Sequence, residues 1–461
     1  MENGEDIKDK INQKDDKKIN DIKKNSLMET HTLKIKVYGS IITDEMIIRR
    51  SQVRGKTMTD NSMRSSKFNL ELLYRQKKEK ELIKSLANSE DITKEKFQLA
   101  EKIEFKTHPD KIEKTDAFGF ILEESNSSNS EEEKSTKSKE KKKKKKDKKK
   151  EKEKNENLLV INARIEKWND MLNHFKDYQT TYYSKLKSRT RKGIPDSLRG
   201  YVWQKLCGAD EFYVKDLYQK LEKEPVDKNI EDIIIKDLDR TFPNCALFKE
   251  KLGKGQRDML KVLSNYSKYN KEVGYIQGMA FICALLLIYM DEERTFFMLH
   301  TLIKKYELEG IYLPGLKDLK KKFYVLLKLE KRFIPKCYKI LLKDEVYPRS
   351  YASEWFICLF SRNLDFKVLV RIFDTFLLEG FKVIYRFSLA FIKLKEEELI
   401  KREKGVDSTF IIMDNCLKNV DVEELFNIAF GFKLKKKRIE KYEKEYEKVK
   451  DDQNNEFIAQ M

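Results

Sequence analysis

The stretch "FKVLVRIFDTFLLEG", Phe366–Gly380, contains the pattern that decides the fold. Its apolar side chains recur every three or four residues, the spacing that places them on one face of an α-helix. Gly380 stands where a glycine commonly ends a helix, because glycine adopts the required backbone conformation without steric cost. The stretch therefore predicts an amphipathic helix that ends at Gly380.

The same spacing continues in both directions, from residue 157 to residue 432. Two further stretches are amphipathic helices by pattern, "RTFFMLHTLIKKY" (Arg294–Tyr306) and "LKDLKKKFYVLLKLEKRF" (Leu316–Phe333). A third, "GMAFICALLLIYM" (Gly278–Met290), is apolar throughout but too short to span a bilayer, and it fits a helix buried in the core. Strand signals are few, so residues 157–432 are predicted to form one large all-α domain that folds alone.

The chain outside this domain is strongly charged. Residues 1–156 are rich in Lys, Glu and Ser, and include the acidic-serine stretch Glu123–Ser135 and the lysine run Lys139–Lys154. Such segments bury too little apolar surface to offset chain entropy, so we expect this region to be mostly disordered. Residues 433–461 form a basic, charged tail with almost no apolar face, which predicts a solvated helix or a frayed end.

Composition limits the function further. The chain has 461 residues, with 97 Lys+Arg against 78 Asp+Glu and a formal net charge of +19, which favours anionic partners. Its 6 Cys form no CxxC motif and we find no secretory signal, so we expect a reducing, cytoplasmic environment. The 4 His lie far apart in the sequence, so no metal site is expected.

The stretch "IIKDLDRTFP", Ile234–Pro243, carries the first candidate site residues. At about 100° per residue, Asp237 and Arg240 lie on one side of a helix, away from the apolar face of Ile234 and Leu238. Arg240 then projects outward in the last turn before Pro243. The alternative is a surface ion pair at a helix C-terminus, where a cation is favourable.

The stretch "VGYIQGMAF", Val273–Phe281, carries further candidate site residues. Gly274 and Gly278 flank Tyr275 and Gln277, and they permit a tight turn or a close backbone approach. Gln277 would then stand at the start of the apolar helix, with an amide that both donates and accepts hydrogen bonds. The alternative is a glycine-rich turn that caps the helix.

A third stretch with candidate residues is "KGIPDSLRGYVWQKLCG", Lys192–Gly208. Arg199 and Trp203 are four residues apart, one helical turn. We interpret this pair as structural, a stacked arginine and a buried indole that anchor the first helix.

These stretches, in this order, resemble the TBC family, the GTPase-activating domains for Rab GTPases. "GIPDSLRGYVW" resembles the family's opening block, "IIKDLDRTFP" its IxxDxxR block and "YIQG" its YxQG block. Ser353–Ile392 is similar to the closing block, with one departure, because Phe373 stands where a Trp is more usual. The resemblance covers residues 157–432.

The resemblance implies an all-helical domain that accelerates GTP hydrolysis by a Rab-type GTPase in its GTP form and so regulates vesicle trafficking. Arg240 would be the arginine finger, held by Asp237, and Gln277 would enter in trans to orient the attacking water. Tyr275 would position the loop, and Arg199 would support the groove or face the GTPase. No cofactor of the chain's own is implied, because Mg²⁺ and GTP belong to the GTPase.

Other functions stay open at this stage. A Rab-binding scaffold could use the same fold without catalysis, although such relatives usually lose the arginine or the glutamine. Lys141–Lys154 could be a solvated linker, a weak contact to an anionic membrane surface or a nuclear import signal. Nucleic-acid binding is disfavoured, because no recognition motif accompanies the lysines. We therefore expect a cytoplasmic protein that is peripheral on endomembranes.

Overall fold

The computed structural model describes residues 115–121 and 159–452. In these residues the regular structure is helical, and the β-type pairing consists of two isolated antiparallel bridges, Thr115–Ile121 and Phe120–Cys245. The prediction of an all-α fold is confirmed. The strongly charged segments at 1–114 and 122–158 lie outside the described residues, so the disorder predicted for them stays a prediction.

Residues 159–173 are helical. The helices that follow are α5 (Phe175–Gln179), α6 (Tyr183–Arg191), α7 (Asp196–Cys207), the 3₁₀ helix η1 (Ala209–Phe212), α8 (Leu217–Lys223), α9 (Lys228–Leu238), α10 (Lys254–Tyr269), α11 (Met279–Leu287), α12 (Glu292–Lys305), α13 (Glu309–Tyr312), α14 (Lys317–Phe333), α15 (Pro335–Lys343), α16 (Pro348–Tyr351), α17 (Ser353–Ile357), α18 (Phe366–Glu379), α19 (Lys382–Leu394), α20 (Glu396–Lys401), α21 (Val406–Asp414), α22 (Val422–Gly431) and α23 (Lys436–Val449).

The amphipathic stretches form the helices that their spacing predicts, as α12, α14 and α18. In α18 the Asp365 side chain accepts a hydrogen bond from the backbone N–H of Lys367 at the N-terminus. At the other end Gly380 adopts a φ of 75° and donates its N–H to the carbonyl of Phe376. Asp365 therefore caps the N-terminus of α18 with its carboxylate, and Gly380 ends the helix in a conformation that glycine adopts easily.

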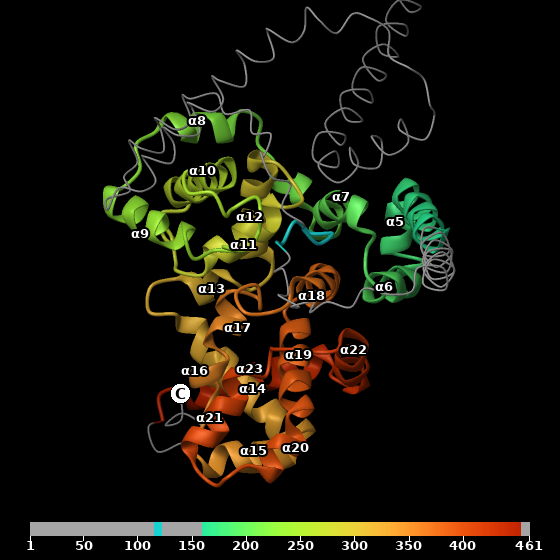
Figure 1. Cartoon of the computed structure of the whole chain (residues 1–461), viewed down its shortest axis with the longest axis vertical. Coiled ribbons are helices and arrows are strands. Elements are labelled where there is room, and N and C mark those ends of the chain that lie inside the picture. Colours follow the sequence, from blue (N-terminus) through green and yellow to red (C-terminus); the bar gives the residue numbers. More distant parts are fainter. Residues whose placement is uncertain (1–114, 122–158, 453–461) are drawn as a thin grey trace, which may run out of the picture. The chain divides into compact units, whose positions relative to one another are not determined.

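Helix α11 is the centre of the first group of helices. Every residue from Met279 to Leu287 is buried, as the apolar run predicts. It packs against α9, α10 and α12 (Figure 1, green to yellow). This burial fixes the start of α11, and therefore the turn that precedes it, relative to the end of α9.

A second group of helices surrounds α14 (Figure 1, orange to red). Helix α14 packs against α15, α16, α19 and α23, and α19 packs against α22. Helix α18 packs against α6, α7 and α19, so it joins the start of the domain to this second group.

The C-terminal helix departs from the expectation of a solvated helix or frayed tail. Helix α23 packs against α14 and buries Ile439 and Tyr446. Its charged residues also take part, because Glu443 forms an ion pair with Lys322, whose side chain is only 2% exposed. Sequence reasoning missed this because the apolar face of α23 is narrow, and its ion pair to Lys322 joins residues that are far apart in the sequence.

Residues 115–121, which fall in the region predicted to be mostly disordered, form a turn that contacts the domain. None of the helices in the described ranges combines the length and the apolar character needed to cross a bilayer.

Candidate functional site

Arg240 lies in the turn that follows α9. The helix ends at Leu238, so Arg240 lies just beyond it and not, as the sequence predicted, in its last turn. Phe242, next to that proline, takes a φ of 46° and turns its ring into the core, where it is 8% exposed. The residue before a proline disfavours helical geometry, so the chain leaves the helix here. The Arg240 side chain is 38% exposed.

Asp237 holds the Arg240 side chain through an ion pair. Its Oδ1 lies 2.5 Å from Arg240 Nη2, and its Oδ2 accepts a hydrogen bond from Tyr275 Oη at 2.5 Å. The Asp237 side chain is only 7% exposed, whereas the helical pattern predicts that it projects outward beside Arg240. The difference arises because the turn containing Tyr275 covers it. Asp237 and Arg240 therefore form a partly buried pair, not a solvated one.

Burial raises the pKa of Tyr275 well above its usual range, and the Asp237 carboxylate raises it further. The phenol therefore keeps its proton at neutral pH and remains a hydrogen-bond donor to Asp237. A carboxylate with two strong donors is fixed in orientation, and this orientation passes to the guanidinium of Arg240.

The turn between α10 and α11 depends on two glycines. Gly274 and Gly278 have φ values of 61° and 109°. A Cβ on Gly278 would lie 2.8 Å from Cys358 Sγ and 2.9 Å from Ile357 Cγ2, closer than real contacts allow. Of the two alternatives predicted, a tight turn or a close backbone approach, the close approach is found at Gly278, against the end of α17 and the residue after it.

This turn brings Gln277 to Arg240. With the Gln277 amide oriented so that its oxygen faces the guanidinium, Oε1 accepts from both Nη atoms of Arg240, with 2.7 Å to Nη1. Both residues are exposed. Two side chains that are far apart in the sequence therefore meet at the surface, each held on the backbone of a different element.

Arg240 and Gln277 line a pocket of about 480 Å³. The wall opposite them comes from the loop after α13 and from α17 with the residues that follow it. Tyr312 ties these two parts together by donating its hydroxyl to the Ile357 carbonyl at 2.7 Å. The lining residues are Arg240, Ile276, Gln277, Gly278, Phe281, Leu313, Pro314, Gly315, Leu316, Glu354, Ile357, Cys358 and Arg362.

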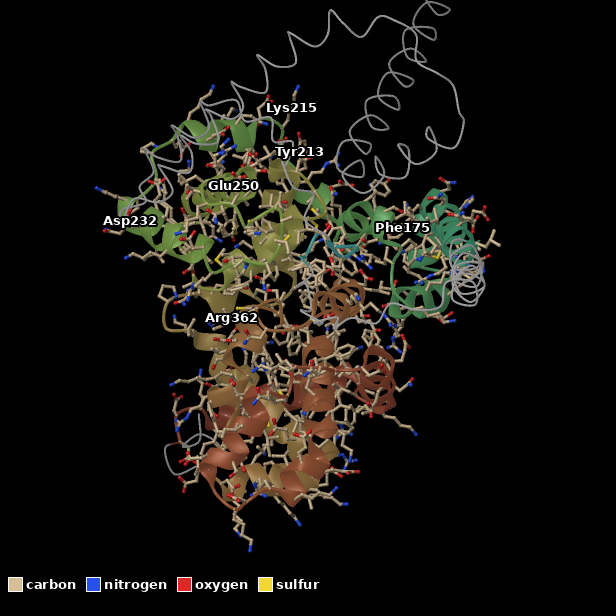
Figure 2. All side chains as sticks on the ribbon, in the orientation of Figure 1. Phe175, Tyr213, Lys215, Asp232, Glu250 and Arg362 are labelled. Carbon is tan, nitrogen blue, oxygen red and sulfur yellow. The ribbon has the colours of Figure 1, made fainter. Side chains whose placement is uncertain are left out.

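A second arginine, Arg362, which is labelled in Figure 2, lines this pocket. It forms an ion pair with Glu354, which also accepts a hydrogen bond from Asn363 Nδ2 at 2.9 Å. Sequence reasoning missed Arg362 and Glu354, because only the packing of α17 brings them to the site. The pocket therefore offers an anionic group the guanidinium of Arg240 and the amide of Gln277 side by side.

Arg199 and Trp203 lie elsewhere, in a buried network between α7 and α18. Arg199 Nε and Trp203 Nε1 both donate to Asp374 Oδ1, at 3.1 and 2.7 Å, and the backbone N–H of Ile194 donates to Asp374 Oδ2 at 2.8 Å. Neither Arg199 nor Trp203 lines the pocket. Asp374 is the residue that sequence reasoning missed here, although it follows Phe373 directly in the "RIFD" stretch.

Groups of three or more His, Cys, Asp or Glu side chains that could hold a metal ion do not occur in the described ranges. The side chains that meet at this site carry a guanidinium (Arg240), an amide (Gln277) and the carboxylate of Asp237.

Comparison with known proteins places the same region in context. The family described as the Rab-GTPase-TBC domain matches residues 196–400. "TBC1 domain family member whacked" of Drosophila melanogaster is 32% identical over 294 residues, which cover 63% of this chain and 80% of that protein. "TBC1 domain family member 10A" of Mus musculus is 36% identical over 252 residues, 54% of this chain and 50% of that protein.

Longer relatives are matched in part. "Ecotropic viral integration site 5 protein homolog" of Homo sapiens is 31% identical over 293 residues, which cover 63% of this chain and 36% of that protein. The chain therefore spans half or less of the length of this human protein and of the mouse protein. Among solved structures, the TBC domain of a Chlamydomonas flagellar RabGAP aligns with a TM-score of 0.48 and 23% identity, over 59% of this chain and 93% of that one.

Proposed function

Because this chain belongs to the Rab-GTPase-TBC domain family, we propose that it accelerates GTP hydrolysis by a Rab-type GTPase, using Arg240 and Gln277 supplied in trans. The observation that carries the proposal is the meeting of these two side chains at one pocket. Arg240 is held there by Asp237, and Gln277 is held by the turn before α11. The partner is a Rab-type GTPase in its GTP form, which brings its own Mg²⁺ and nucleotide.

Arginine suits this task on chemical grounds. Charge accumulates on the phosphate oxygens as the γ-phosphoryl group is transferred, and a guanidinium donates two aligned hydrogen bonds to such oxygens while staying charged at any physiological pH. An arginine finger in trans contributes about 10³–10⁵ in rate, roughly 4–7 kcal/mol. Asp237 keeps the fork oriented before the GTPase binds, so less freedom is lost on association.

Gln277 completes the site. Its amide both donates and accepts, so it can orient a water molecule for attack on the γ-phosphorus. In the free protein this amide contacts the guanidinium of Arg240. Binding of the GTPase exchanges that contact for contacts to the phosphate and the water.

We also propose where the chain acts, and the charge of the lysine run supports this part of the proposal. Lys141–Lys154 lies outside the described residues, and its charge favours weak attachment to the anionic cytoplasmic surface of endomembranes, at about 1 kcal/mol for each lysine near the surface. Binding to acidic vesicles that falls with added salt, and that falls further when Lys141–Lys146 are replaced by Gln, supports this. Unchanged binding contradicts it.

The proposed activity is tested with a panel of purified, GTP-loaded Rab proteins. Phosphate release is recorded for each with and without this chain, at catalytic concentrations of the chain. We expect strong acceleration for at least one Rab. Binding to GTP-loaded Rabs without acceleration of any of them would contradict the proposal and favour a non-catalytic scaffold.

A further inference from the structure

The turn at Thr115–Ile121 contacts the domain beside the loop that carries Arg240. We propose that this turn is a clamp for the Arg240 loop, and that Phe118 and Phe120 are positioning residues for the reaction. The inference deepens the proposed function and rests on it. It concerns residues that the family match at 196–400 does not include.

The turn is built from its own sequence, "TDAFGFI". Asp116 Oδ1 accepts hydrogen bonds from the backbone N–H groups of Phe118 and Phe120, at 2.8 and 3.0 Å. The Asp116 N–H donates to the Phe120 carbonyl at 2.8 Å, and Gly119 takes a φ of 84°. An Asp that bonds the backbone two residues on, with a Gly in the left-handed region, makes a defined turn from local chemistry.

The turn then pairs with the backbone that follows Arg240. The Ile121 N–H donates to the Asn244 carbonyl at 2.9 Å, and the Ala246 N–H donates to the Gly119 carbonyl at 2.9 Å. These two bonds flank the bridge between Phe120 and Cys245. The loop therefore receives strand-like pairing from a segment more than a hundred positions earlier.

Aromatic packing completes the contact. The turn lies close to α18 (Figure 1, cyan). Phe118 and Phe120 both pack against Phe366 at the start of α18, with ring-centroid distances of 5.2 and 4.8 Å. Phe120 also meets Phe242 edge to face at 5.8 Å. Phe242 in turn meets Phe281, a lining residue of the pocket, at 5.9 Å.

Phe242 links the clamp to the arginine. It stands two residues after Arg240 and has a φ of 46°, in a region that non-glycine residues occupy only when their surroundings hold them there. Phe120 supplies part of that surrounding. Without it Phe242 gains room to relax, and the relaxation moves the backbone of Arg240. The clamp acts through position alone, since neither Phe118 nor Phe120 lines the pocket.

The test uses the full chain with Phe118→Ala and Phe120→Ala combined. Hydrogen exchange of the peptide spanning residues 241–248 reports the clamp without any Rab, because it includes the Ala246 amide. Single-turnover hydrolysis over a range of chain concentrations separates the maximal rate from half-saturation. Two variants serve as controls, Phe120→Leu, which keeps apolar packing, and Phe410→Ala, which removes a 43% exposed ring far along the chain in α21.

We expect exchange in 241–248 to rise and the maximal rate to fall about tenfold or more, with half-saturation changed less than about threefold, because a misplaced arginine costs transition-state contacts more than binding. Phe120→Leu should recover most of the rate, and Phe410→Ala should match the parent. A folded double variant with parental exchange would overturn the proposal, and so would raised exchange with a parental maximal rate.

If the double variant does not fold, Asp116→Ala replaces it under the same criteria, because it removes the two side-chain hydrogen bonds of the turn and keeps both aromatic rings. A parent chain that accelerates no Rab contradicts the proposed function instead. In that case exchange in residues 241–248 decides whether the clamp holds the loop.

Discussion

Arg240 is aimed by two neighbours that lie on different elements. Asp237 holds one Nη atom from the end of α9, and Tyr275 fixes Asp237 from the turn before α11. A long side chain at 38% exposure would otherwise sample many rotamers. The proposed catalysis therefore depends on a hydrogen bond that does not touch the substrate.

Tyr275→Phe tests that dependence. The change removes the hydroxyl that donates to Asp237 Oδ2 and keeps the ring, so the buried carboxylate loses one of its two donors. We expect the maximal rate of GTP hydrolysis to fall about tenfold, which is about 1.4 kcal/mol, with Rab affinity nearly unchanged. Tyr269→Phe, at a 39% exposed position, is the matched control and should keep the parental rate.

Gly278→Ala tests the close approach of the turn to α17. An alanine there meets Cys358 Sγ and Ile357 Cγ2, and its φ of 109° is strained, which costs on the order of 1–3 kcal/mol. We expect a lower melting temperature and a lower rate of GTP hydrolysis, because the turn must shift and Gln277 moves with it. Gly380→Ala is also strained but meets nothing within 4 Å, so it should lower stability and leave the rate per folded molecule intact.

At the scale of the helix, α23 shows how far a charge-rich sequence can mislead. Its pattern has almost no apolar stripe, yet Ile439 and Tyr446 are buried against α14. Between these two residues, ion pairs are formed by Glu440, Lys441, Glu443 and Glu445. Sequence periodicity reports the width of an apolar face, not the presence of a complementary partner. Amphipathic α12, α14 and α18 were predictable because their faces are wide.

The packing of α23 predicts a measurable contribution to stability. Replacing Ile439 and Tyr446 together by Ala should lower the free energy of unfolding by about 2–5 kcal/mol, because both are removed from a buried interface. Lys436→Ala with Lys441→Ala on the same helix is the control, since these side chains are 77% and 70% exposed. Equal denaturation midpoints for the two double variants would show that α23 is not part of the folded unit.

For the whole molecule, one buried carboxyl predicts a pH dependence of stability. Glu330 in α14 is fully buried, and burial raises its pKa to about 8 while Tyr351 donates to it at 2.6 Å. The unfolded chain loses this proton near pH 4, at about the ordinary glutamate pKa of 4.3, whereas the folded chain keeps it to about pH 8. Between these values the folded state binds more protons, so this group lowers stability as pH rises.

Glu330→Gln isolates the effect, because the amide stays neutral and still accepts from Tyr351. The free energy of unfolding of the variant, minus that of the parent, should increase from about pH 5 to about pH 8 by on the order of 2 kcal/mol or more. Chemical denaturation at several pH values measures it. Glu397→Gln, at an 86% exposed side chain, should show no such trend, and a trend shared by both variants would contradict the assignment.

Across the molecule, the sequence predicted what local spacing determines. The helical fold, the buried α11 and the glycine turn follow from patterns within one stretch. The choice of Arg240 and Gln277 as site residues rests instead on the resemblance of several stretches, in order, to the TBC family. What it could not predict requires contacts between distant stretches. The burial of Asp237 depends on Tyr275, Arg362 reaches the pocket through the packing of α17, and the turn at 115–121 gains its place only by pairing with Asn244 and Ala246.

The central claim is tested most directly by single-turnover phosphate release from a responsive GTP-loaded Rab with Arg240→Ala, paired with a melting curve. Arg240 lies outside α9 and its side chain is 38% exposed, so the variant should stay folded, with a melting temperature lowered only by the loss of one of the two donors to Asp237. Hydrolysis should fall about 10³-fold or more. Arg240→Lys should recover little, because a point charge lacks the planar fork. Gln277→Ala should also be severely impaired, and the two changes together should cost less than their sum. Near-parental hydrolysis by a well-folded Arg240→Ala chain would contradict the account.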